Sequence, residues 1–159
     1  MNDSNIDFLN YLIENDTIKV KIKANDWQDA INKCFEKLLK NNVVNNAYIS
    51  EIISSTIKLG PYYIICPNVA MPHANPKFGS FGNAFSLITL DEPVFFDDKP
   101  INILIGFSAK NDKNHLEIAL PQICAVFENT NIVNQICKAN NKKEIINIIN
   151  KIDYKKYLR

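Results

Sequence analysis

The amino-acid sequence predicts an α/β fold: a single-domain sandwich over residues 1–159, with a mixed β-sheet flanked by helices. The first observation behind this prediction is the order of the elements. Helices and one strand come first, several short apolar runs follow, and helices end the chain. The second observation is that no repeat, linker or low-complexity segment divides the sequence. A chain of this length can bury one proper hydrophobic core.

The N-terminal region predicts a helix followed by a strand. Residues 4–14 carry apolar side chains at helical spacing behind Ser4, which is the expected cap. Residues 17–23 then alternate strictly between apolar side chains and lysines. Strict alternation indicates a half-buried strand, and the lysines are typical of a strand near the edge of a sheet.

Two amphipathic helices are expected next. Asn25 or Asp26 is expected to cap the first, whose apolar stripe begins at Trp27. The second spans about residues 46–58 and ends at Gly60-Pro61. The side chains expected to face inward on this second helix are Tyr48, Ile49, Ile52, Ile53 and Ile57.

The middle of the chain predicts strands and its end predicts helices. Short apolar runs bounded by Pro, Gly, Asn and Asp are Tyr62–Cys66, Val69–Met71, Ala84–Leu90 and Ile101–Phe107. The last two are expected to be central strands that are buried on both faces. A polar loop follows, and the helices expected after it span about 114–128, 131–138 and 142–157.

Composition and charge exclude several classes of function. Eighteen Lys and Arg stand against 17 Asp and Glu, so the net charge is only +1 and a nucleic-acid partner is not expected. No apolar run reaches the length of about 18 residues that a transmembrane helix needs, and the polar start lacks the layout of a signal peptide. The four cysteines form no CxxC pair, which predicts neither a zinc site nor a disulfide framework. We therefore expect a protein of the reducing cytoplasm.

His73 is the first candidate for chemistry. It lies between Pro72 and Pro76, directly after a predicted strand. Proline fixes its own φ and restricts the residue before it, so the backbone on both sides of His73 is expected to be nearly rigid. Such a frame presents the next side chain at a fixed angle, which suits a nucleophile that must react in line.

His115 is the second candidate and the only other histidine in the sequence. Asn111, Asp112 or Asn114 can cap the predicted helix there and place His115 in or near its first turn, where free N–H groups favour an anion. Other interpretations stay open: a lone histidine is often structural, and two histidines could be metal ligands, although no third ligand is evident.

The segment from Leu59 to Ala74, LGPYYIICPNVAMPHA, resembles the phosphorylation-site segment of enzyme IIA proteins of the bacterial phosphotransferase system. It is similar to the mannitol/fructose superfamily and, within it, to the ascorbate-type branch. The family's apolar-Pro-His-Ala signature matches His73. Further matches in the same order are the Pro-Val-apolar strand at Leu90–Phe96, the central strand at Ile101–Phe107 and the second histidine in Asn114-His-Leu. The resemblance covers about residues 45–150.

This resemblance implies a phosphocarrier of sugar uptake, possibly of ascorbate, with no cofactor and no metal. The carrier protein HPr would phosphorylate Nε2 of His73, His115 would hydrogen-bond the phosphoryl oxygens, and a cysteine of the cognate IIB would take the group on. The sugar would be phosphorylated as it crosses the membrane through IIC, whereas this chain itself would not enter the membrane. The resemblance leaves a homodimer open.

Some residues depart from the family pattern. Asn114 stands where relatives often have Ser, and Asn75 where ascorbate-type relatives tend to have a basic residue. Relatives often carry an arginine upstream of the active histidine, where this chain offers only Lys58. Charge stabilisation is therefore expected to rest on His115 and backbone N–H groups, while Glu117 is expected to be a surface carboxylate. The sugar stays undetermined.

An apolar rim around His73 is the expected docking surface for partner proteins. Its candidate residues are Met71, Phe78 and Phe81, although both phenylalanines could instead fold inward and cover the sheet. Two other functions remain open. One is a regulatory, nitrogen-type IIA protein that signals by its phosphorylation state. The other is an interaction module of the same fold without turnover.

Overall fold

The structure, a computed structural model, describes residues 6–111 and 114–157, and of residues 114–116 and 157 the backbone alone. Its sheet has five strands in the order β1-β4-β5-β3-β2. Their bounds are β1 (Ile18–Ile22), β2 (Ile64–Cys66), β3 (Asn68–Ala70), β4 (Ala84–Phe96) and β5 (Lys99–Ser108). The β1–β4 and β3–β5 pairs are parallel, whereas β4–β5 and β2–β3 are antiparallel. The predicted mixed sheet is confirmed.

The burial of the side chains of β1, β4 and β5 explains which of these strands are central and which lies at the edge of the sheet. The strands β4 and β5 lie inside the sheet, and their apolar runs are buried on both faces, as predicted. The lysine-bearing strand β1 forms an edge. Lys21 has a φ of 51°, and the register of β1 against β4 shifts between Lys19 and Ile22. Such an irregularity, together with the lysines, protects an edge strand from pairing with other chains.

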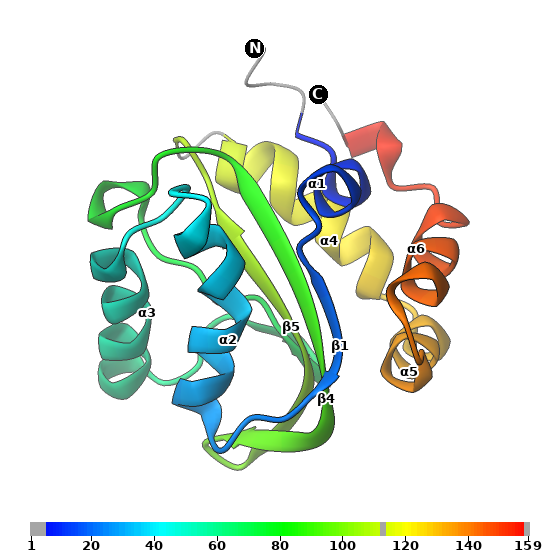
Figure 1. Cartoon of the computed structure of the whole chain (residues 1–159), viewed down its shortest axis with the longest axis horizontal. Coiled ribbons are helices and arrows are strands. Elements are labelled where there is room, and N and C mark those ends of the chain that lie inside the picture. Colours follow the sequence, from blue (N-terminus) through cyan, green and yellow to red (C-terminus); the bar gives the residue numbers. More distant parts are fainter. Residues whose placement is uncertain (1–5, 112–113, 158–159) are drawn as a thin grey trace.

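Helices cover both faces of the sheet, which makes a three-layer sandwich (Figure 1). The helices are α1 (Phe8–Asn15), α2 (Trp27–Lys40), α3 (Asn46–Leu59), α4 (Leu120–Phe127), α5 (Thr130–Lys138) and α6 (Lys142–Asn150). On one side α2 and α3 bury a core against the sheet, and on the other side α1 and α4–α6 bury a second core. The described residues also form three short helical segments: η1 (Pro76–Phe78), η2 (Asn114–Ala119) and η3 (Lys155–Tyr157).

Several predicted boundaries are wrong by a few residues. Asp7, and not Ser4, caps α1, because its carboxylate accepts the Asn10 N–H; Ser4 lies outside the described residues. Asp26 caps α2, as one of the two predicted caps. The final predicted helix ends at Asn150 instead of continuing to 157, because the chain turns at Lys151 before η3.

The inward face of α3 differs from the prediction at its C-terminal end. Ile57 is 68% exposed, whereas Thr56 is buried. The Thr56 hydroxyl lies 2.6 Å from the hydroxyl of the buried Tyr63, so this pair occupies the position next to the sheet. Gly60 then ends the helix with a φ of 82°, which glycine adopts without strain, and this end matches the prediction.

Candidate functional site

The two histidine-bearing segments follow neighbouring strands. His73 comes three residues after β3, and η2 begins six residues after β5. The strands β3 and β5 are adjacent and parallel, so their C-terminal ends meet at the same end of the sheet. Ligand sites of α/β proteins commonly form at such ends. The side chain of His115 lies outside the described residues, so its predicted contact with a bound anion stays a prediction.

The imidazole of His73 is held in one orientation. Its Nδ1 lies 2.7 Å from the backbone oxygen of Met71. A carbonyl oxygen can only accept a hydrogen bond, so Nδ1 carries the proton and donates it. In the neutral ring the lone pair is therefore on Nε2, which makes Nε2 the nucleophilic atom.

Burial favours this neutral ring. His73 is partly buried, and burial lowers the pKa of its imidazole below the ordinary value because the charged form loses hydration. The hydrogen bond to Met71 opposes this shift and is the smaller effect. The imidazole is thus uncharged at neutral pH, the state that a nucleophile needs.

Two tyrosines hold the backbone beside the imidazole. The Tyr62 hydroxyl donates to the carbonyl oxygen of His73 at 2.9 Å. The N–H of Ala74 donates to the hydroxyl of Tyr48 at 3.1 Å, and that hydroxyl donates to the oxygen of Phe107 at 2.8 Å. The rings of Tyr62 and Phe107 also stand edge-on to the His73 imidazole, with centroids 5.9 and 6.4 Å away.

The sequence analysis missed the roles of both tyrosines. It placed Tyr48 on the buried face of a helix and Tyr62 at the start of a strand. One signal was available, because a buried tyrosine differs from phenylalanine only by a hydroxyl that needs a partner. Nothing in the local sequence identifies that partner.

The prolines frame the segment as expected. Pro72 is buried, and Pro76 occupies the first turn of η1, where its fixed φ is favourable. Asn75 caps η1 by accepting the N–H of Lys77 at 3.0 Å. Asn75, where the resemblance led us to expect a basic residue, therefore has a structural role as a cap.

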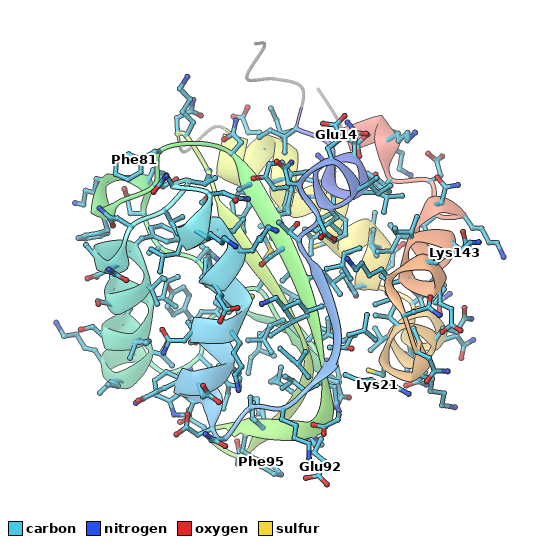
Figure 2. The ribbon with its side chains drawn as sticks, in the orientation of Figure 1. Glu14, Lys21, Phe81, Glu92, Phe95 and Lys143 are labelled. Atoms are coloured by element: carbon cyan, nitrogen blue, oxygen red, sulfur yellow. The ribbon has the colours of Figure 1, made fainter. Side chains whose placement is uncertain are left out.

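The predicted rim is partly wrong. Met71 is fully buried in the core, because β3 leads it between the sheet and the helices, so it cannot contact a partner. Phe78 and Phe81 are exposed by 37% and 64%, so they do not fold inward over the sheet. Figure 2 shows Phe81 at the end of the molecule opposite Phe95. Tyr62, 50% exposed, is an aromatic surface residue that the sequence analysis did not include in the rim.

The charged candidates lie at the surface. Lys58 and Glu117 are exposed, the latter as expected. Among the residues that the structure describes, no group of three His, Cys, Asp or Glu side chains is placed to hold a metal ion. Within the same residues, no helix is long and apolar enough to cross a membrane.

Comparison with known proteins identifies close relatives. Residues 11–152 match the family model for the phosphoenolpyruvate-dependent sugar phosphotransferase system, EIIA 2. The chain is 37% identical over 155 residues to the ascorbate-specific PTS system EIIA component of Mycoplasma pneumoniae, covering 96% of this chain and 98% of the relative. It is 38% identical over 137 residues to the mannitol-specific cryptic phosphotransferase enzyme IIA component of Escherichia coli K12, covering 85% and 92%. The crystal structure of a PTS IIA protein (PtxA) from Streptococcus mutans superposes with a TM-score of 0.89 at 34% identity, covering 97% and 99%.

Proposed function

The chain belongs to the EIIA 2 family of the phosphoenolpyruvate-dependent sugar phosphotransferase system, and we propose that His73 is the residue on which it carries the phosphoryl group. It is a phosphocarrier of a sugar phosphotransferase system and, as such, a phosphotransferase. The observation that carries the assignment to His73 is the hydrogen bond from Nδ1 to Met71, which leaves the lone pair on Nε2.

The proposed step is an in-line transfer between two nitrogen atoms. Nε2 of His73 attacks the phosphorus of phospho-HPr, the P–N bond to the HPr histidine breaks, and a P–N bond to Nε2 forms. The proton on Nδ1 of His73 stays on the ring and stays hydrogen-bonded to the Met71 oxygen throughout. In the second step a cysteine thiolate of IIB attacks the same phosphorus, a P–S bond forms, the P–N bond to Nε2 breaks, and Nε2 of His73 regains its lone pair. Both donors are activated phospho-residues, so the transfer uses positioning and charge stabilisation, with no oxidant or reductant.

His115 completes the proposed site. The resemblance assigns it the phosphoryl oxygens. The order of the elements supports this role, because η2 follows β5, which is adjacent and parallel to the strand that leads to His73. We further propose that the whole of residues 1–159 is one EIIA domain, that it works in the cytoplasm, and that the sugar is ascorbate. The ascorbate-specific relative supports the choice of sugar because its match covers 96% of this chain, whereas the match of the mannitol-specific relative covers 85%.

The test is phosphate transfer from phosphoenolpyruvate through enzyme I and HPr to the purified chain. The wild type should acquire an acid-labile, base-stable phosphate, and His73→Ala should acquire none. His115→Ala should retain a slower signal, because it keeps the nucleophile and loses one stabilising donor. If the wild type took up no phosphate from active HPr, the carrier role would be wrong, and the chain would fit the interaction-module interpretation. Ascorbate uptake with the cognate IIB and IIC tests the sugar.

A further inference from the structure

The peptide group that joins His73 to Ala74 is bonded on both sides. Its C=O accepts the Tyr62 hydroxyl at 2.9 Å, and its N–H donates to the Tyr48 hydroxyl at 3.1 Å. In a trans peptide these two groups point in opposite directions. The two hydroxyls therefore bind the C=O and the N–H from opposite sides, and together they fix the orientation of the peptide plane. The ψ angle of His73 is fixed with it, and so is the direction in which the imidazole leaves the backbone.

The Tyr48 hydroxyl also reaches a second segment. It donates to the carbonyl oxygen of Phe107 near the C-terminal end of β5, at 2.8 Å. Tyr48 is fully buried in the first turn of α3, where Asn45 caps the helix by accepting the Tyr48 N–H. One hydroxyl thus joins α3, the segment after His73 and the strand that leads toward His115.

We propose that Tyr48 and Tyr62 are positioning residues for phosphoryl transfer, whose hydroxyls clamp the 73–74 peptide so that Nε2 of His73 faces its phosphoryl donor in line. This inference rests on the proposed role of His73. The bond from Nδ1 to Met71 fixes rotation of the ring, and the two tyrosines fix the backbone that carries it. A nucleophile whose ring and backbone are both fixed loses little conformational freedom on reaching the transition state.

The two tyrosines differ in exposure, and the proposal assigns them different sensitivity. Tyr48 is fully buried, so its contacts are the same whether or not a partner protein is bound. Tyr62 is 50% exposed and its ring lies beside the imidazole. A docking partner can therefore cover Tyr62, which strengthens its hydrogen bond to His73 by excluding water.

A matched control exists in another part of the molecule. Tyr154 is also buried, and its hydroxyl also accepts a backbone N–H, that of Leu9, at 3.1 Å. It also donates to a second oxygen, on Asp7. Replacing it by phenylalanine removes the same kind of contacts, in the core that α1 and α4–α6 form, without touching the His73 segment.

The experiment compares Tyr48→Phe, Tyr62→Phe and Tyr154→Phe with the wild type. The first readout is the rate of phosphorylation by phospho-HPr at several HPr concentrations. The second is the 15N NMR spectrum of the His73 imidazole, which distinguishes the Nδ1–H from the Nε2–H tautomer and does not depend on activity. Tyr48→Phe is expected to lower kcat about tenfold with KM for phospho-HPr unchanged. Tyr62→Phe is expected to lower kcat several-fold, and both variants should increase the population of the Nε2–H tautomer.

Tyr154→Phe is expected to keep the wild-type rate and tautomer, even if its unfolding midpoint falls as far as that of Tyr48→Phe. The proposal is overturned if Tyr48→Phe and Tyr62→Phe transfer phosphate at the wild-type rate, or if Tyr154→Phe slows transfer equally. Should Tyr48→Phe fail to fold, the exposed Tyr62→Phe decides by the same two readouts. A wild type that accepts no phosphate would instead refute the proposed function, and the tautomer measurement separates that result from failure of the clamp.

Discussion

Two buried tyrosines, Tyr48 and Tyr154, make nearly the same hydrogen bonds in the two cores of this protein. Each hydroxyl accepts a backbone N–H at 3.1 Å and donates to a second oxygen. Tyr154 thereby ties the C-terminal segment to the start of α1. Tyr48 ties α3 to the segment after His73 and to β5. The same kind of hydrogen bond joins the two ends of the chain in one core and positions the candidate nucleophile in the other.

The difference lies in what each hydroxyl holds. The Tyr154 bonds end on α1, which packs against the sheet and has no candidate functional residue. One Tyr48 bond ends on β5 at Phe107, and the other ends on Ala74, in a segment of irregular backbone outside the strands. A helix keeps its shape when one contact is lost, because its own backbone hydrogen bonds remain. An irregular segment changes conformation more easily when a hydrogen bond that holds it is lost. Damage near Tyr154 should therefore lower stability alone, and damage near Tyr48 should lower stability and transfer together.

The largest expected effect on stability comes from replacing Gln122 in the core that contains Tyr154, between the sheet and α1 and α4–α6. The Gln122 amide is buried between α1 and α4, where it accepts the Phe8 N–H at 3.0 Å and donates to the Ile6 oxygen at 2.6 Å. Gln122→Leu leaves both backbone groups unpaired and should lower the free energy of unfolding by roughly 2–5 kcal/mol. Denaturant titration measures the loss. The matched control is Gln28→Leu at an exposed position of α2, expected to stay within about 0.5 kcal/mol. Phosphate uptake by folded Gln122→Leu should equal that of the wild type, and a slowed uptake would contradict the comparison.

The second-largest effect on stability is expected from Gly106→Ala, on the face of the sheet that α2 and α3 cover and where Tyr48 lies. A Cβ on Gly106 would lie 2.3 Å from Oγ of Ser86 and 2.9 Å from Sγ of Cys34. Both side chains are buried, and the Ser86 hydroxyl donates to the Cys34 oxygen at 2.7 Å, so neither can move freely. Gly106→Ala should cost about 1–3 kcal/mol of stability.

Gly106→Ala should also slow transfer, because the shift of β5 moves the neighbouring Phe107 oxygen that Tyr48 holds. Rapid-quench phosphorylation at a temperature where the variant is fully folded measures this. An unchanged rate of phosphorylation in a clearly destabilised variant would contradict the comparison, because damage in the core with Tyr48 would then lower stability alone, as in the core with Tyr154.

The third effect compares two helix caps. The side chain of Asn45 accepts the Tyr48 N–H at 3.0 Å, and that of Asp7 accepts the Asn10 N–H at 3.3 Å. Asn45→Ala and Asp7→Ala should each lower the free energy of unfolding by about 1 kcal/mol. The loss should be larger for Asp7→Ala because its carboxylate also accepts the Tyr154 hydroxyl. Transfer should slow only in Asn45→Ala, which loosens the turn that carries Tyr48. Equal transfer rates in the two variants would argue against this difference.

The smallest effect is a pH dependence on the Tyr48 side. Burial lowers the pKa of His73 below its ordinary value of about 6.5. As the pH falls through about 6.5 toward the native pKa, the unfolded chain binds the proton first, so the contribution of His73 to stability falls. Burial raises the pKa of Tyr154, so that residue contributes no change in this range. NMR titration should find a His73 pKa below 6.5 and phosphate uptake that persists below that pH. A pKa above 6.5 would contradict the buried, neutral nucleophile.

Much of the fold followed from local pattern. Continuous apolar runs identified β4 and β5 as central strands, and alternation with lysines identified β1 as an edge, because burial on one or two faces leaves a direct record in the order of side chains. The strand order and register did not follow, since they depend on pairing between segments far apart in the chain. The outward turn of Ile57 was also missed, because Thr56 occupies the inward position with a hydrogen bond to Tyr63.

The same division holds at the candidate site. The sequence by itself determined the family resemblance, the proline frame and the choice of His73, since each of these depends on the identity and order of residues along the chain and not on how distant segments pack. Only the tertiary structure decided which imidazole nitrogen has the proton and which tyrosines hold the 73–74 peptide. Tyr48 is separated from Ala74 by 26 positions and from Phe107 by 59. A hydroxyl has no local preference for either partner, so its bonds exist only once the sheet and α3 have packed together.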